Sequence, residues 1–401
     1  MSAVLASAGT RIKLGIVANE FFDRDVGRIG GFGWAAARVA RCFGEDPELG
    51  VDVVFLTGEV KVADGGGERI VNGTRLLGLD GGASRYARRV RRARLDLLLL
   101  IDYRPSYQTA IRARRRTPVI LWARDPRPPE DVARVSTLEI PGAPGTLPQG
   151  VSPIDCTSFA RVVRRAWWWR RQVLVATTTP YLHAKVPGTY GIEPREIFTL
   201  PNIIDVPSGP VRKSASPTVV FLGRLDPYKR PWIAVELARL FPEVTFLFLG
   251  QTHFRGAGSW APIDLPSNVK LLGHTDGAEK EAALAAAWVL VNTSIHEGLP
   301  VSFLEALAWE TPILSCQNPE DVASRFGVYV GRSDGTGLES LPAFASGLRR
   351  LLDSAPLRER LGAEGRQWVA ATHTRLRFLE AFADLCRRAG LRPRFGGAIG
   401  A

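Results

Sequence analysis

The sequence predicts an α/β protein of two doubly wound domains, on three observations. Short apolar runs alternate with helix-compatible segments through most of the 401 residues, a pattern typical of parallel sheets covered on both faces. The alternation stops at 205–217, a stretch rich in proline and serine, and then restarts. The composition is that of a folded protein, because 45% of the residues are apolar and 23% are charged.

The elements of the first half are expected in a regular order. Strands are expected at 12–18, 51–56, 97–101, 119–122, 173–176 and 198–200, and helical segments at 34–43, 85–94 and 159–171. The proline-rich stretch 124–155 is expected to be a long loop.

The second half repeats the pattern after the linker. Strands are expected at 219–222, 244–249, 269–271, 289–292 and 313–315, and helices at 231–240, 279–287, 302–309 and across 340–386. Ligands of such folds bind beyond the carboxyl ends of the strands. Residues that directly follow a strand are therefore the first candidates for chemistry.

The charge of the chain favours an anionic partner. The net charge is +12, and residues 1–200 hold 30 basic and 20 acidic residues. A phosphorylated small molecule, an anionic membrane surface or nucleic acid would suit this half, although an arginine-rich composition alone gives the same excess. The four cysteines are far apart and form no CxxC pair, which argues against a zinc site or disulfide framework and suits a reducing cytosol.

The strongest functional signal is a pair of glutamates eight residues apart, Glu297 and Glu305. Glu297 follows the strand at 289–292, and Glu305 is expected about one turn into the next helix. Backbone N–H groups at 298–302 would meet an anion at the start of this helix. A carboxylate that accepts two hydrogen bonds suits a ribose diol.

A second signal is the pair Arg224 and Lys229, which follows the strand at 219–222. Both cations would lie at the carboxyl edge of the second sheet, where they could clamp a diphosphate. Each motif alone is common on protein surfaces, but together in one doubly wound domain they favour function over structure.

These motifs resemble those of the large retaining GT-B glycosyltransferase family (family 4, group 1) that contains sucrose synthases and bacterial mannosyl- and glucosyltransferases. The resemblance covers about residues 205–386 and also uses the loop at Gly250, the Gly273-His274 pair, the PNIID segment at 201–205 and the segment 306–313. It implies two Rossmann-like domains that face a deep cleft. It makes Arg224, Lys229 and Glu297 the catalytic residues and places Glu305 on the donor ribose. The further donor-binding residues that it implies are Gly31, Gly33, His274, Thr275, Gly298, Leu299 and Pro300.

The resemblance also implies the roles of the domains. Residues 1–204 would form the acceptor-binding domain, 205–217 the linker and 218–386 the nucleotide-sugar-binding domain. The tail at 387–401 would pack back on the N-terminal domain.

The first domain resembles the family more loosely, through the glycine-rich loop that contains Gly31 and Gly33. This loop also fits the dinucleotide fingerprint GxGxxA, with Glu59 as the acid that a dehydrogenase needs. The first strand ends about a dozen residues before the loop, however, which is too far for a tight Rossmann turn.

Two departures from the family concern other positions. Many relatives carry a histidine where this chain has Arg124 and Asp125, and often a glycine where it has Glu310. Arg124 and Asp125 are therefore candidates for the acceptor side, together with Asp23 and Asp25. The last two also imitate a DxD metal motif, which we interpret as a coincidence because Arg224 and Lys229 already offer charge to a diphosphate.

A basic, tryptophan-rich stretch at 161–171 is open to two interpretations. Its arginines surround Trp167, Trp168 and Trp169, as at a membrane interface. The alternative is a surface helix packed on its own sheet, with Phe159, Val162, Val163, Ala166 and Trp167 on the buried face.

The sequence thus predicts a retaining hexosyltransferase that uses a nucleotide diphosphate sugar and needs neither a metal nor another cofactor. The alternatives are a sugar-nucleotide epimerase or phosphorylase on the same fold, or a catalytically silent sugar-nucleotide-binding subunit. The donor base, the sugar and the acceptor stay open, the acceptor being lipid-linked, anionic or a small soluble molecule. No nucleic acid is expected, because no recognition motif accompanies the arginines. We expect a cytoplasmic protein, with peripheral contact on the inner face of the cell membrane as an open alternative.

Overall fold

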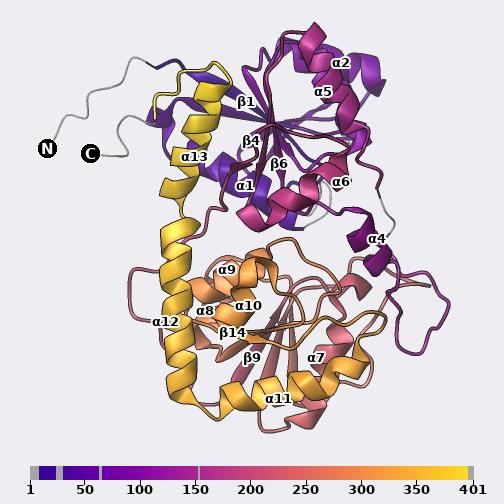
Figure 1. Ribbon diagram of the computed structural model, residues 1–401, viewed down its shortest axis with the longest axis vertical. Coiled ribbons are helices and arrows are strands. Elements are labelled where there is room, and N and C mark those ends of the chain that lie inside the picture. Colours follow the sequence, from indigo (N-terminus) through magenta and orange to yellow (C-terminus); the bar gives the residue numbers. More distant parts are fainter. Residues whose placement is uncertain (1–8, 24–29, 63–65, 152–153, 396–401) are drawn as a thin grey trace, which may run out of the picture. The chain divides into compact units, whose positions relative to one another are not determined.

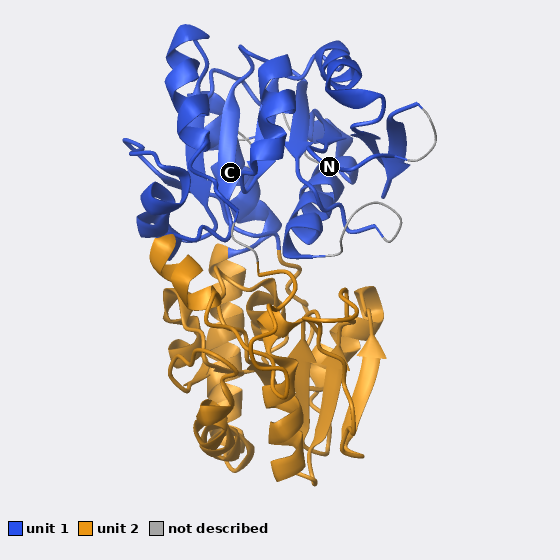
Figure 2. Cartoon of the chain, turned by 90° about the vertical axis from the view of Figure 1, so that its right-hand side faces the viewer, with its two compact units in different colours: residues 1–128, 154–203, 373–401 blue, residues 129–153, 204–372 orange. Residues whose placement is uncertain are grey.

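The computed structural model describes residues 9–23, 30–62, 66–151 and 154–395. The chain divides into two compact units (Figure 2). Unit 1 comprises residues 1–128, 154–203 and 373–401, and unit 2 comprises residues 129–153 and 204–372. Each unit holds one largely or wholly parallel sheet with helices around it (Figure 1), so the expected α/β class is confirmed.

The sheet of unit 1 has the strand order β3-β4-β2-β1-β5-β6-β7-β8. All neighbours are parallel except the β3–β4 hairpin. The central strand β5 consists of five aliphatic residues that are all buried, as a strand covered on both faces requires. The strands are β1 Ile12–Val17, β2 Val51–Leu56, β3 Glu68–Val71, β4 Thr74–Leu77, β5 Leu97–Ile101, β6 Val119–Ala123, β7 Val173–Thr177 and β8 Phe198–Thr199.

The helices of unit 1 cover this sheet with their apolar faces. Helix α1 buries Trp34, Val39 and Phe43, and Phe43 packs against Phe378 and Phe382 of α13. The helices are α1 Gly31–Gly44, α2 Gly82–Arg92, α3 Gln108–Ala113, α5 Phe159–Trp168, α6 Val186–Tyr190 and α13 Arg375–Arg388.

The sheet of unit 2 has the order β11-β10-β9-β12-β13-β14, and all its strands are parallel. Between β9 and β12 the winding reverses direction, which makes this point the topological switch where such sheets bind ligands. The strands are β9 Thr218–Leu222, β10 Thr245–Leu249, β11 Val269–Gly273, β12 Val289–Asn292, β13 Ile313–Ser315 and β14 Gly327–Tyr329.

Two helices of unit 2 begin with a proline, where the missing N–H costs no hydrogen bond. One is α7 Pro231–Leu240, which the sequence predicts with the same bounds. The others are α4 Pro129–Val135, α8 Gly277–Ala286, α9 Val301–Ala308, α10 Val322–Arg325, α11 Leu341–Leu352 and α12 Ala355–Thr372.

The units follow other boundaries than the expected domain ranges 1–204 and 218–386. Residues 129–153 belong to unit 2 and contain helix α4, so the expected long loop at 124–155 is wrong in part. The apolar residues Val135, Leu138, Ile140 and Val151 of the segment 129–153 are buried in the core of unit 2. Helix α13 belongs to unit 1, where its phenylalanines find aromatic partners. Both differences arise because long-range packing decides where a local segment lies.

Candidate active site

The charged side chains that follow β9 and β12 meet beyond the ends of these strands. Lys229 Nζ lies 2.5 Å from Glu297 Oε1, and their side chains are 21% and 10% exposed. The same carboxylate oxygen accepts hydrogen bonds from Ser294 Oγ (2.6 Å) and Asn292 Nδ2 (3.3 Å). Three side chains, those of Lys229, Ser294 and Asn292, therefore hold this oxygen of Glu297 in one place.

Arg224 also lies at this edge, and it is held by an acid that the sequence does not single out. Its Nε is 3.3 Å from Asp226 Oδ2, and Asp226 is almost fully buried. Asp226 Oδ1 accepts the backbone N–H of His253 at 3.1 Å. The guanidinium keeps its part-exposed position at the strand end, where it can face an anion.

Glu305 lies on α9, and a buried lysine of α8 holds it. Lys280 Nζ lies 2.9 Å from Glu305 Oε1 and 2.9 Å from Asp276 Oδ1. Burial alone would lower the pKa of Lys280, but the two carboxylates outweigh burial and raise the pKa. The contact with Lys280 therefore fixes the orientation of the Glu305 carboxylate. Sequence reasoning missed Lys280 because an Asp276–Lys280 pair at i,i+4 looks like an ordinary surface pair.

The backbone around the site is shaped by glycine at the ends of β9, β10 and β11. Gly250 has φ +157°, and a Cβ there would lie 1.8 Å from the carbonyl oxygen of Gly223. Gly250 N donates to the carbonyl oxygen of Gly273 at 2.7 Å. The three strand-end loops therefore approach one another closely, and only glycine fits at position 250.

The remaining donor residues predicted in unit 2 lie on the loops that follow β11 and β12. His274 and Thr275 follow β11, and Thr275 is buried. Gly298, Leu299 and Pro300 connect Glu297 to α9, whose first turn begins at Val301. Phe303 N donates to the carbonyl oxygen of Pro300 at 3.1 Å. N–H groups nearer the start of an α-helix have no acceptor within it, so those of Val301 and Ser302 can receive an anion.

Arg230 and Glu310 show which neighbouring charges are structural. Arg230 is fully buried and donates to the carbonyl oxygens of Thr293 and Ser294 and of Ser333. Glu310, which stands where members of the resembling family often have glycine, has φ +54° and pairs with Arg366 at 2.6 Å. The ion pair offsets the backbone strain that a residue other than glycine meets there.

The glycine-rich loop of unit 1 opens α1, and the two glycines differ. A Cβ on Gly33 would lie 2.7 Å from the backbone nitrogen of Phe22. A Cβ on Gly31 would meet no described atom within 4 Å. Glu20 Oε2 accepts the N–H of Gly33 at 3.4 Å, so a carboxylate occupies the positive end of the helix. Sequence reasoning missed Glu20, which carries no motif.

The four acceptor-side candidates lie in different environments. Asp25 lies outside the described residues, whereas Asp23 lies on the loop after β1. Asp125 pairs with Arg127. Arg124 is buried, and its guanidinium lies 4.4 Å from the ring centroid of Trp122.

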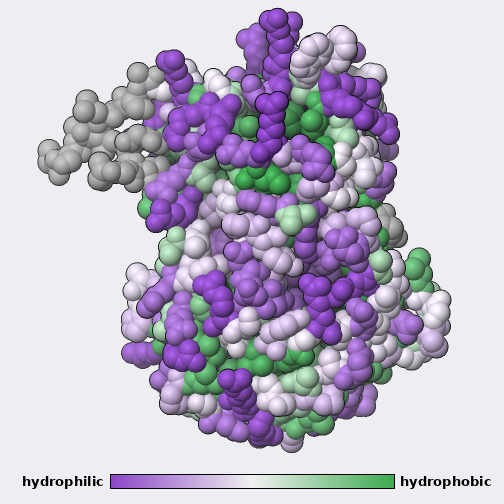
Figure 3. Space-filling model, in the orientation of Figure 1, coloured by the Kyte–Doolittle hydropathy of each residue, from purple (hydrophilic) through white to green (hydrophobic). Residues whose placement is uncertain are grey.

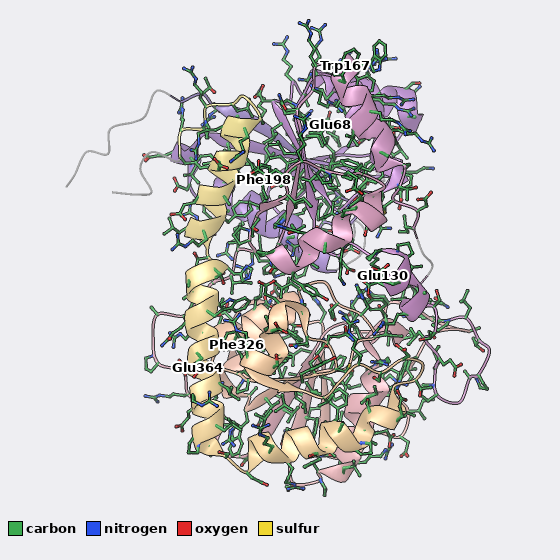
Figure 4. The ribbon with its side chains drawn as sticks, in the orientation of Figure 1. Glu68, Glu130, Trp167, Phe198, Phe326 and Glu364 are labelled. Atoms are coloured by element: carbon green, nitrogen blue, oxygen red, sulfur yellow. The ribbon has the colours of Figure 1, made fainter. Side chains whose placement is uncertain are left out.

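Helix α5 corrects the expected buried face. Phe159, Val162 and Ala166 are buried as expected, but Trp167 is 78% exposed and Trp168 is 76% exposed. Their rings contact each other edge to face, with centroids 5.1 Å apart. Figure 4 shows Trp167 projecting from the outer end of the helix. The helix ends at Trp168, so both tryptophans lie in its last turn.

Solved structures share this architecture. The sucrose-phosphate synthase of Thermosynechococcus elongatus is 16% identical, with a TM-score of 0.67 over 94% of this chain and 99% of that one. HepE of Anabaena, solved with UDP and glucose, is 12% identical, with a TM-score of 0.63 over 94% and 99%. The lipopolysaccharide outer core galactosyltransferase WaaB is 12% identical, with a TM-score of 0.59 over 94% and 100%. The fold of this chain is therefore that of the GT-B glycosyltransferases.

The family comparison identifies the chain more closely. Residues 208–368 match the family model described as glycosyl transferases group 1. This range lies within unit 2 and contains Arg224, Lys229, Glu297 and Glu305. Residues 208–368 therefore form a domain of the group 1 glycosyl transferase type.

Proposed function

We propose that this enzyme moves a hexosyl group from a nucleotide diphosphate sugar to an acceptor hydroxyl, with retention of configuration and without a metal. The observation that carries the proposal is the fixed pair of Lys229 and Glu297 beside Arg224 at the ends of β9 and β12. HepE, a neighbour in fold, has been solved with UDP-glucose, which makes UDP sugars the first donors to test.

The two cations would act on the diphosphate. Departure of the nucleotide diphosphate builds negative charge, and preorganised cations stabilise that charge in the transition state. Arg224 and Lys229 supply two positive charges in place of a metal ion. The first turn of α9 adds backbone N–H groups on the same side.

The two glutamates would divide the donor between them. Glu305 would accept hydrogen bonds from the ribose hydroxyls, because the carboxylate has one oxygen, Oε1, on Lys280 and a second oxygen to offer. Glu297 would accept from hydroxyls of the transferred sugar through Oε2. In the resembling family the leaving phosphate takes the acceptor proton on the same face, so no separate base is required.

The direct test is a hydrolysis and transfer assay with UDP- and GDP-hexoses in EDTA. We expect slow release of free nucleoside diphosphate from at least one donor, and an EDTA-resistant rate. A new sugar nucleotide would indicate an epimerase, and neither product would indicate a silent binding subunit. A rate that EDTA abolishes and Mg²⁺ restores would overturn the metal-free mechanism.

We further propose that unit 1 contacts an anionic membrane surface, on which the acceptor is carried. Trp167 and Trp168 are exposed, and the flanking Arg161, Arg164 and Arg165 are exposed too. Strongly hydrophilic residues crowd the margin of Figure 3 at which Figure 1 places α2 and α5. Aromatic rings beside cations suit a lipid headgroup region. No helix of the described residues is long and apolar enough to cross a membrane.

Vesicle co-sedimentation tests this contact. The protein should pellet with phosphatidylglycerol vesicles at low salt and be released by high salt, because the Debye length falls from about 10 Å at 0.1 M to about 3 Å at 1 M. The double variant Trp167→Ala/Trp168→Ala should bind less, whereas Trp288→Phe, in unit 2, should not change binding. Wild-type protein that stays in the supernatant at low salt would exclude the membrane surface and favour a soluble acceptor.

The four cysteines are free thiols, which supports a reducing compartment such as the cytoplasm.

A further inference from the structure

A second group of polar side chains lies at the carboxyl edge of the sheet in unit 1. Asp102 follows β5, Arg124 follows β6 and Asn202 follows β8. The parallel strands β5 to β8 are neighbours in the sheet, so their ends meet at one edge. His373 Nδ1 accepts the backbone N–H of Asn202 at 3.2 Å, and burial, followed by the charge of Arg124, lowers the pKa of His373.

Arg124 has no hydrogen bond or ion pair for its guanidinium in the described part of the chain. The residue is 6% exposed, and its Nη1 is enclosed without a partner. The charges of Asp102 and Asp125 favour the charged form of Arg124, but neither carboxylate bonds its guanidinium: Asp125 pairs with Arg127, and Asp102 Oδ1 accepts the backbone N–H groups of Arg124 and Asp125. Buried arginines are almost always paired, since an uncompensated buried charge is strongly unfavourable. The missing partner of Arg124 therefore points to a ligand.

Asn202 and Asp102 leave further polar atoms open. Asn202 is fully buried, and neither its Nδ2 nor its Oδ1 has a partner among the described residues. Asp102 Oδ2 is also unpartnered, while Tyr190 Oη donates to Oδ1 at 2.7 Å. Asp102 has φ +51°, a strained conformation of the kind that gathers at functional sites. The open atoms comprise donors for an oxyanion and acceptors for a hydroxyl group.

We propose that Arg124 and Asn202 bind an oxyanion group of a hydroxylated acceptor, with Asp102 Oδ2 accepting a hydrogen bond from one of its hydroxyls. The proposal rests on the proposed function for the identity of the ligand as acceptor. Arginine suits this role because its planar fork matches a phosphate or a carboxylate. The acceptor group is then a sugar phosphate, a sugar acid or a related anionic polyol, either free in solution or as the headgroup of a lipid.

The test is calorimetric titration of the UDP-saturated protein with glucose 6-phosphate, glucuronate and uncharged glucose. A charged probe should bind at least about tenfold more tightly than glucose, the size expected for one charge-assisted hydrogen bond. The two charged probes distinguish a phosphate from a carboxylate. Arg124→Met, which keeps length over Trp122, should weaken the charged probe by about tenfold to a hundredfold. Arg124→Lys should fall between the two, and the exposed-site control Arg115→Gln should match wild type.

The thermal midpoint of the ligand-free variant separates binding from structure. An arginine held for a ligand should be dispensable to the fold, so Arg124→Met should melt at the wild-type temperature or above it. A clearly lower midpoint, or wild-type protein that binds neither charged probe, would overturn the proposal. Loss of UDP binding in Arg124→Met would assign Arg124 to the donor instead. If wild-type protein binds a charged probe but no nucleotide, the site stands and the proposed transferase function fails.

Discussion

The charged groups of the two units are arranged in opposite ways. In unit 2 the site cations are already paired, Lys229 with Glu297 and Lys280 with Glu305. In unit 1, Arg124 is buried, and its guanidinium has no hydrogen-bonding partner among the described residues. The paired cations of unit 2 suit a ligand group that all donors of one class share, such as the diphosphate. The unpartnered guanidinium in unit 1 suits a ligand that is particular to this protein. The family match covers unit 2 alone, which agrees with this division.

The largest expected effect concerns the cations of unit 2. Lys229→Ala or Arg224→Ala should lower turnover by roughly 10²–10³, because each removes one preorganised cation from the developing charge. Initial rates with a saturating donor measure the effect. Arg239→Ala is the matched control, because it removes a part-exposed arginine in the last turn of α7, which pairs with Glu236. Near-normal turnover in both single variants would remove the assignment.

The next effect separates the two glutamates. Glu305→Gln should weaken binding of the free nucleoside diphosphate by about 1–3 kcal/mol, the size of a hydrogen bond to a charged group. Glu297→Gln should spare the nucleoside diphosphate and weaken the intact sugar donor instead. Calorimetry with UDP and with a UDP sugar gives both numbers, and the reverse order would mean that the two roles are exchanged.

A third effect concerns stability and comes from His373 in unit 1. Burial, followed by the nearby charge of Arg124, lowers the pKa of His373 from 6.5 to about 3. Between these values the unfolded chain binds a proton that the folded protein does not, so stability falls as the pH falls. From pH 7 to pH 5 this residue should remove about 2 kcal/mol from the free energy of unfolding.

Urea unfolding of wild type and His373→Gln at both pH values isolates this contribution. The wild type should lose about 2 kcal/mol more than the variant. Asp102, whose pKa burial raises to about 6, acts in the opposite sense and is present in both proteins. Equal losses in the two proteins would show that His373 titrates normally and that the cluster is open to water.

The smallest expected effect contrasts two glycines of one loop. Gly33→Ala places a Cβ 2.7 Å from the backbone nitrogen of Phe22 and should destabilise unit 1. Gly31→Ala meets no described atom and lies at the first position of α1, so it should stabilise by up to about 1 kcal/mol through the entropy of the unfolded chain. Thermal unfolding of both variants gives the comparison, and equal effects would exclude a close backbone approach at position 33.

The sequence predicts the periodic elements and the strand-end motifs well, because these depend on local patterns. The strands at 97–101 and 289–292 and the helix at 231–240 have the predicted bounds. Prediction from the sequence fails where contacts between distant residues decide the place of a segment. This is the case at 129–153, whose apolar residues fill the core of unit 2. It also fails for Lys280, because its partner Glu305 is distant in sequence. The exposure of Trp167 follows from where α5 ends, which helical periodicity does not fix.

Calorimetric titration of nucleoside diphosphates in EDTA tests the central claim most directly, which is that the charged residues of unit 2 form a metal-free donor site. UDP, GDP, ADP and dTDP would be titrated into wild type, Lys229→Ala and Glu305→Gln. At least one nucleoside diphosphate should bind wild type with a stoichiometry near one, both variants should bind it more weakly, and Mg²⁺ should not change the affinity. Binding to none of the four, binding that appears only with Mg²⁺, or equal binding by all three proteins would contradict it.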